Sequence, residues 1–155
     1  MNKTILRIMI CSFMLMALFA QDNNPPIINV EKENNKMNDA IQTAKTTFPK
    51  FIENWKTLKN NGYSIKVAMK TTDNGTEHIW FNPSEIRGDV ITAECANEPR
   101  NIAGLKLGDV REINVKDISD WMIVVGKKCY GGYTIRVLAK QDPKNAPPFE
   151  FVDFK

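Results

Sequence analysis

Three side chains with acid–base or charge chemistry stand out in the sequence: His78, Asp120 and Arg136. His78 is the one histidine of the chain, and an imidazole can shuttle protons or bind a metal. A small hydrolytic or acid–base enzyme would place it within hydrogen-bond reach of Glu77 or Asp120. The alternative is a structural histidine packed beside Trp80 at a strand edge. A metal site is disfavoured, because no second histidine and no cysteine stand at ligand spacing.

Asp120 lies in a short run that also has a structural explanation. Asp117 and Ser119 are predicted to cap a single helical or 3₁₀ turn by accepting backbone N–H bonds. Ile118 and Trp121, three residues apart, are predicted to point inward. On this interpretation the run has a structural role. The carboxylate of Asp120 is the one group in it that this role does not require.

Arg136 follows a glycine pair, Gly131 and Gly132. The pair does not resemble a phosphate loop, because a strand is expected to start at once and no helix N-terminus follows to receive an anion. We interpret the glycines as a bulge or a close backbone approach beside Trp121. Arg136 is expected either to bind an anionic ligand or to pair with a carboxylate such as Asp120.

The N-terminus has the build of a secretory signal peptide. Lys3 and Arg7 precede an apolar run of 13 residues, 8–20, which ends at a polar, proline-containing stretch. Spanning a bilayer takes roughly 20 apolar residues, so a retained membrane helix is the weaker interpretation. We predict cleavage after Ala20. The mature chain is then secreted or periplasmic, with no stable membrane anchor.

The composition is that of one globular domain, with 155 residues, 43% hydrophobic and 25% charged. Removing residues 1–20 takes two basic residues from 21, which leaves 19 basic against 18 acidic residues. A nucleic-acid partner is not expected, because such binders carry a basic stripe or a strong positive charge. The sequence indicates no cofactor.

Two cysteines remain in the mature chain, Cys95 and Cys129. An exported protein reaches a compartment that permits disulfides. Closing this loop would stabilise the fold by roughly 3–4 kcal/mol in the chain-entropy model. The two cysteines are therefore a candidate disulfide, with two buried free thiols as the alternative.

Hydrophobic periodicity predicts an α+β fold. After a flexible leader, 21–36, apolar residues recur at helical spacing from Met37 to Trp55, with Pro49 inside the helix and a kink or a restart expected there. Six short strands are expected at 63–71, 77–82, 90–95, 110–115, 121–125 and 133–139, with an irregular loop over 96–107. Short connections imply an antiparallel sheet. The domain spans 37–140, a proline-rich surface tail covers 141–155, and closure of the sheet into a partial barrel is left open.

Several of these segments together resemble a known family. The succession EHIW, NEP, GDV, ISDW and GGYTIR, from Glu77 to Arg136, is similar to the YegJ-like family, Domain of Unknown Function 2314. The resemblance, which includes the signal peptide and the helix, spans nearly the whole chain. It implies a small, often exported bacterial domain. The family has no established activity, so the resemblance assigns no role to any residue.

The leading functional interpretation is a non-catalytic binding domain. Its partner would be a protein or an envelope component, met by the surface around Trp80, Asp120 and Arg136. The motivation is that no nucleophile with its base, no ligand cluster and no cofactor loop can be assembled from the sequence. The alternatives are the His78 enzyme and an inhibitor or immunity protein. The sequence leaves the oligomeric state open.

Overall fold

A computed structural model describes residues 35–58 and 62–154, and its first element is a long helix, α1 (Asn35–Asn54). The helix buries one stripe, made of Met37, Ala40, Ala44, Phe48 and Phe51. This confirms most of the predicted helical face, although Ile52, which the pattern includes, is exposed and Trp55 lies beyond the end of the helix. The helix continues through Pro49, so the predicted restart at that residue is wrong. It also begins inside the predicted leader, whose residues 21–34 lie outside the described ranges, as do residues 1–20, for which a signal peptide is predicted.

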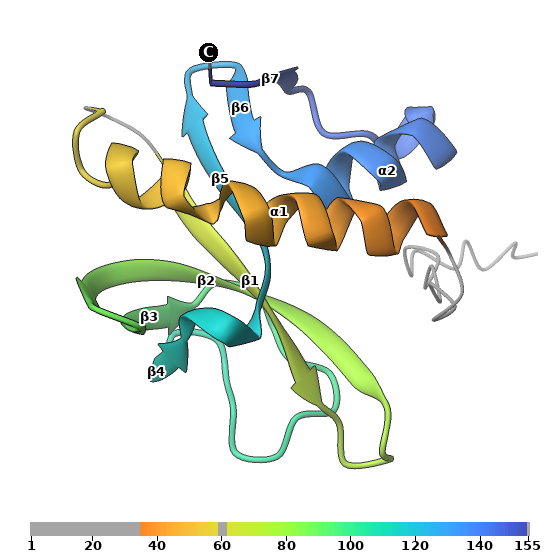
Figure 1. The fold of residues 1–155 in the computed structure, drawn as a ribbon. Helices are drawn as coiled ribbons and strands as arrows, with labels where there is room; N and C mark the ends of the chain where they lie inside the picture. Colours follow the sequence, from red (N-terminus) through yellow and green to blue (C-terminus); the bar gives the residue numbers. More distant parts are fainter. Residues whose placement is uncertain (1–34, 59–61, 155) are drawn as a thin grey trace, which may run out of the picture.

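The strands of the described ranges form one open sheet of seven (Figure 1). The strands are β1 (Gly62–Lys70), β2 (Thr76–Arg87), β3 (Val90–Cys95), β4 (Val110–Asn114), β5 (Ile118–Val125), β6 (Lys128–Gly131) and β7 (Glu150–Val152). Their order is β4-β3-β2-β1-β5-β6-β7, and among these described strands only β6 and β7 pair in parallel. The α+β class is confirmed. The sheet has two edges, so a barrel is not formed, and there is one strand more than expected.

The β1–β2 hairpin forms where the Asn-Gly turn predicts it. Asn74 has a φ angle of +64°, and Lys70 pairs with Thr76 directly beyond the turn. β2 then runs further than predicted, because a register shift at Pro83 lets the strand continue to Arg87. A proline cannot donate to the ladder, and such an irregularity accommodates it.

The segment 133–139 is not a strand, so the sequence prediction is wrong there. It forms the helix α2 (Tyr133–Gln141). The strand that follows β5 and pairs with it is the short β6, which comes just before this helix in the chain. The backbone leaves the sheet at Gly131 and Gly132, whose φ angles of +72° and +63° lie in the left-handed region. The apolar residues after the glycines alternate as they would in a strand. The backbone has already left the sheet before this segment begins, so the segment cannot pair with β5.

The predicted surface tail is partly structured as well. After α2 and the 3₁₀ turn η2 (Pro143–Asn145), β7 pairs with β6, and the ring of Phe154 stacks on Tyr130 with 4.2 Å between ring centres. Residues 150–152 of the tail therefore belong to the sheet.

The core lies between α1 and the sheet, and Trp121 of β5 is at its centre. Its indole N–H donates to the carbonyl of Ala44 on α1 at 3.0 Å, and its ring lies 5.8 Å from that of Phe51. None of the helices in the described ranges has the length and apolar character needed to cross a membrane.

Candidate functional site

The strand register brings polar residues of β1, β2 and β5 together on the sheet face away from Trp121. Lys66 of β1 lies opposite Trp80 of β2 on one side and opposite Asp120 of β5 on the other. We call Lys66, His78, Trp80, Asp120 and Thr134 the polar row. Sequence patterns do not point to two of its members, Lys66 and Thr134, because only the register and the start of α2 place them here.

Asp120 is fully buried and fixes the start of α2. Its Oδ1 accepts from the backbone N–H groups of Trp121 (2.8 Å) and Tyr133 (3.1 Å), and its Oδ2 accepts from the N–H (2.8 Å) and hydroxyl (2.6 Å) of Thr134. The N-cap residue Gly132 has no side chain to do this. A helix N-terminus therefore does follow the glycines, contrary to the prediction, and the anion that it receives is Asp120.

Lys66 reaches Asp120 through Thr134. The ammonium donates to Thr134 Oγ1 at 3.0 Å and lies 5.2 Å from the centre of the Trp80 ring. Burial raises the pKa of Asp120, and the bonds from Thr134 oppose that rise. Burial likewise lowers the pKa of Lys66, and the Asp120 charge opposes the fall. The backbone N–H partners of Asp120 can only donate, so its contacts fit an ionised carboxylate.

His78 does not meet either predicted carboxylate. Its Nδ1 lies 3.0 Å from Ser119 Oγ, and the Ser119 hydroxyl donates to the carbonyl of Lys66 at 3.2 Å. The Glu77 carboxylate instead accepts from the backbone N–H groups of Arg100 and Asn101. Both proposed acid–base pairs are therefore wrong. Ser119 is only 3% exposed, which leaves its hydroxyl unsuited to attack a substrate.

The run 115–121 differs from its prediction in one respect. A 3₁₀ turn forms at η1 (Val115–Asp117), but its cap is the side chain of Asn114, which accepts from the N–H of Lys116, and not Asp117 or Ser119. Ile118 and Trp121 are buried as expected, at 1% and 0% exposure. β5 begins directly after the turn, so Ser119 is a residue of the strand and not a helix cap.

Arg136 is used to hold the C-terminal segment. It pairs with Asp153 at 2.9 Å and donates to the carbonyls of Gly131 (2.9 Å) and Val152 (2.7 Å). The predicted carboxylate partner exists, but it is not Asp120. With Asp120 buried and Arg136 engaged, only Trp80 of the three predicted binding residues remains as a candidate for contact with a partner.

Cys95 and Cys129 are free and buried, so the predicted disulfide is wrong. They lie on β3 and β6, and β2, β1 and β5 separate those strands. Neighbouring strands are about 4.8 Å apart, whereas a disulfide needs Cα atoms within roughly 7 Å. Burial raises the pKa of both thiols, that of Cys129 to about 11. Within the described ranges no cluster of potential metal ligands occurs.

Gly131 confirms the predicted close approach to Trp121. A Cβ atom at this position would lie 2.3 Å from the carbonyl oxygen of Trp121 and 2.6 Å from its ring. No side chain fits there.

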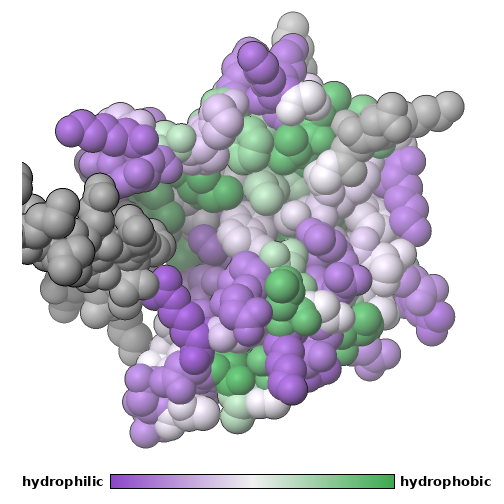
Figure 2. Space-filling model, turned by 180° about the vertical axis from the view of Figure 1, so that it is seen from behind, coloured by the Kyte–Doolittle hydropathy of each residue, from purple (hydrophilic) through white to green (hydrophobic). Residues whose placement is uncertain are grey.

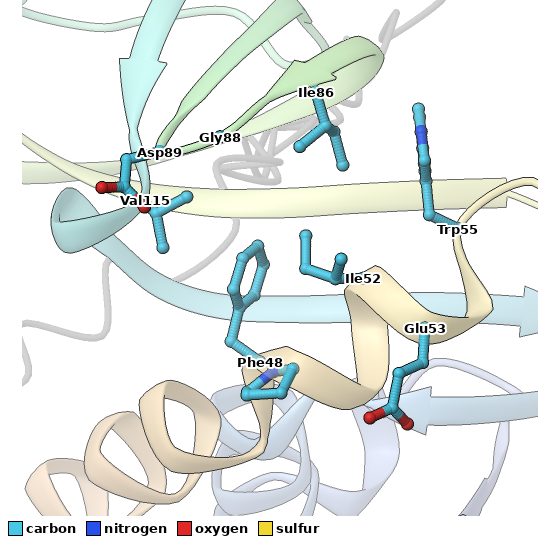
Figure 3. Close-up of a pocket in the computed structure, with 9 residues that line it drawn as sticks. Phe48, Ile52, Glu53, Trp55, Ile86, Gly88, Asp89 and Val115 are labelled. Atoms are coloured by element: carbon cyan, nitrogen blue, oxygen red, sulfur yellow. The ribbon is translucent and has the colours of Figure 1, made fainter.

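A second feature, an apolar groove, lies between the C-terminal half of α1 and the β2–β3 turn (Figure 3). Its volume is about 600 Å³, and its apolar lining includes Phe48, Ile52, Trp55, Ile86 and Val115. In Figure 3, Phe48 and Ile52 rise from the helix toward Ile86 and Val115. Ile52 is 40% exposed, which is unusual for a member of the helical stripe. The sequence gives one weak signal for the groove. Ile52 lies next to the buried apolar stripe of α1, which makes the apolar face of the helix wider than the part covered by the sheet.

The charged residues that line the groove are Glu53 and Asp89. Within residues 35–58 and 62–154, neither carboxylate has an ion pair or a side-chain hydrogen bond. The lining of the groove is thus mainly apolar and includes two carboxylates, while the Lys56 ammonium lies 5.1 Å from the centre of the Trp55 ring at its edge.

The fold and the two surface features define a small α+β domain with one helix laid over an open sheet. The chain belongs to the family described as an uncharacterized protein conserved in bacteria (DUF2314), whose model matches residues 34–146. The chain is 35% identical over 109 residues to the uncharacterized protein YegJ of Escherichia coli (strain K12), covering 70% of each chain. It is 29% identical over 127 residues to a putative ankyrin repeat protein of Neisseria meningitidis serogroup B, covering 74% of this chain and 49% of that protein. No solved structure matches the chain.

Proposed function

We propose that this chain is a non-catalytic binding domain that docks an apolar protein segment carrying basic residues in the groove beside α1. The observation that carries the proposal is the combination of an open apolar floor with two unpaired carboxylates, Glu53 and Asp89, within the described part of the chain. An apolar segment would cover Ile52 and its neighbours, and basic side chains on that segment would meet the two acids. An inhibitor or immunity protein would be a special case of such docking.

The arrangement around His78 supports binding over catalysis. The ring is held by Ser119 and reaches neither Glu77 nor Asp120, and both of those carboxylates already accept backbone N–H groups. An acid–base pair needs its two side chains within hydrogen-bond reach, and in the described part of the chain His78 has no carboxylate there. The groove with the apolar floor lies elsewhere, against α1.

A calorimetric titration with two synthetic amphipathic peptides tests the proposal. One peptide contains leucine and lysine, and the other has glutamate at each lysine position. We expect the lysine peptide to bind roughly tenfold more tightly, because only its side chains complement Glu53 and Asp89. Equal affinity for the two peptides, or no binding of either, would overturn the proposal.

Two double variants locate the binding. Glu53→Lys with Asp89→Lys should weaken the lysine peptide by roughly tenfold or more. Glu94→Lys with Glu112→Lys is the matched control, because it makes the same change of charge at exposed positions of β3 and β4, outside the groove lining. If the control weakens binding as much, net charge and not the groove attracts the peptide.

We also propose that the domain acts after export. Support comes from the apolar run 8–20 behind Lys3 and Arg7, and from the start of the family match at residue 34, beyond that run. N-terminal sequencing of the protein recovered from the periplasm or the medium should begin at Gln21. Recovery only from the cytoplasm with residues 1–20 retained would contradict export.

A further inference from the structure

The polar row presents hydrogen-bonding groups that the fold itself does not use. Lys66 has three N–H donors, and one of them is taken by Thr134. Asp120 cannot take the others, because its two oxygens already accept four hydrogen bonds. Within the described part of the chain Lys66 therefore has no carboxylate in direct contact. Its remaining N–H donors have no acceptor in this part of the chain, and an anionic group from outside can supply one.

His78 offers an acceptor on the same face. The single hydroxyl hydrogen of Ser119 goes to the carbonyl of Lys66, so Ser119 Oγ receives the hydrogen of His78 Nδ1. In a neutral ring the other nitrogen, Nε2, then carries a lone pair. Burial lowers the pKa of His78, and the charge of Lys66 lowers it further, which favours the neutral ring. Nε2 has no partner among the described residues and can accept from a ligand hydroxyl.

Asn82 offers donors on the other side of Trp80. Ser64 donates to Asn82 Oδ1 at 3.1 Å, so the amide nitrogen is directed elsewhere and has no partner in the described ranges. His78, Trp80 and Asn82 alternate along β2 and so project from one face, with Lys66 opposite Trp80 on β1. An indole is thus flanked by an acceptor, a donor and a cation.

From this arrangement we infer that the face around Trp80 binds an anionic sugar. The C–H face of the sugar ring would lie against the part of the Trp80 indole that stays exposed beside Lys66, its carboxylate or phosphate would meet Lys66, and its hydroxyls would meet His78 Nε2 and the Asn82 amide. An aromatic ring with hydrogen-bonding groups around it suits such a ligand, which carries C–H groups on the faces of its ring and hydroxyls around it. Figure 2 shows hydrophilic and hydrophobic residues side by side over the surface seen from behind. The inference does not depend on the groove.

Titration of the purified protein with D-glucuronate, D-glucose and acetate, followed by ¹H–¹⁵N NMR, tests this inference. Glucuronate should shift the amide signals of Lys66, His78 and Trp80 and the Trp80 indole signal. It should bind roughly tenfold more tightly than glucose, which lacks the charge, or acetate, which lacks the ring. Absence of shifts at these residues, or equal binding of acetate and glucuronate, would overturn the inference.

Four variants complete the experiment. Lys66→Met keeps the apolar stem and should weaken glucuronate by roughly tenfold, whereas Lys66→Arg should keep most of the affinity. Trp80→Leu should weaken glucuronate and glucose alike, because it removes the platform. The groove variant Glu53→Lys with Asp89→Lys should bind glucuronate as the wild type does. If the groove variant alone weakens glucuronate, the sugar site has been misplaced.

Discussion

Asp120 and Trp121 are neighbours on β5, and both are fully buried, yet they meet opposite surroundings. Trp121 packs against the rings of Phe51, Tyr133 and Phe154 and needs one hydrogen bond from its indole N–H, given to Ala44. Asp120 is surrounded by donors and needs four. One face of the strand is therefore stabilised by apolar burial, which tolerates approximate geometry. The other face depends on polar partners that must all be in place.

The largest expected effect comes from the apolar face. Trp121→Ala would remove the centre of the core and leave a cavity under α1, so we expect a loss of about 4 kcal/mol in the free energy of unfolding. Denaturant unfolding measures the change. A cost near zero would mean that the apolar face does not stabilise the fold through Trp121.

On the polar face, a substitution that changes a single atom of Asp120 should lower the free energy of unfolding nearly as much. Asp120→Asn keeps the shape but turns an acceptor into a donor facing Thr134, and it leaves Lys66 without its nearest carboxylate. We expect a loss of about 3 kcal/mol in the free energy of unfolding, as for a broken buried charge pair.

A double-mutant cycle separates the two parts of that loss. Lys66→Met combined with Asp120→Asn should cost less than the sum of the single changes, because the uncompensated ammonium is gone. Strict additivity of the unfolding free energies would contradict the coupling through Thr134.

The close approach of the Gly131 backbone to Trp121 can be tested by substitution. Gly131→Ala should cost about 2 kcal/mol or more, since its Cβ would meet the Trp121 carbonyl and its φ angle is positive. Gly126 is the matched control, because its φ angle of +59° is similar but a Cβ atom added there would have nothing within 4 Å. Gly126→Ala should cost only about 1 kcal/mol. Equal losses for the two variants would show that the close approach is unimportant.

The smallest effect is expected at the margin of the polar row. His78 has a pKa below its ordinary value of 6.5 in the folded state, so the unfolded chain binds the proton more readily. Stability should therefore fall as the pH drops from about 7 through 6.5 toward the folded-state pKa. His78→Gln should flatten this part of the stability profile measured by thermal unfolding between pH 5 and 8. A profile that is unchanged in the variant would contradict the assignment.

Local pattern is enough to predict much of the sheet. Alternation places Ile79 and Phe81 on the buried face and His78 and Trp80 on the other, because side chains alternate along any strand. The Asn-Gly turn predicts its hairpin for a similar reason, since a positive φ angle is a property of the turn residues themselves. Each of these features depends on residues within a few positions of one another.

The wrong predictions concern features that depend on residues far apart in the sequence. The pattern from Tyr133 to Ala139 alternates like a strand, but the two glycines before it turn the chain into α2. Asp120 is buried and not at the surface, and nothing nearby in the sequence shows that the first turn of α2 covers it. The chemistry of the cysteines suggests a pair, but the strand order separates them. The groove joins α1 to a turn more than thirty residues later.

The family, the α+β class, the long helix and the inward position of Trp121 all follow from the sequence, because motifs, periodicity and hydrophobic burial predict them without further information. Three other features exist only in the folded molecule: Lys66, Thr134 and Asp120 meet, Glu53 and Asp89 flank one groove, and Arg136 holds the C-terminal segment. Strand register and helix placement are set by the whole core at once, so polar contacts between distant segments arise only after that core has formed.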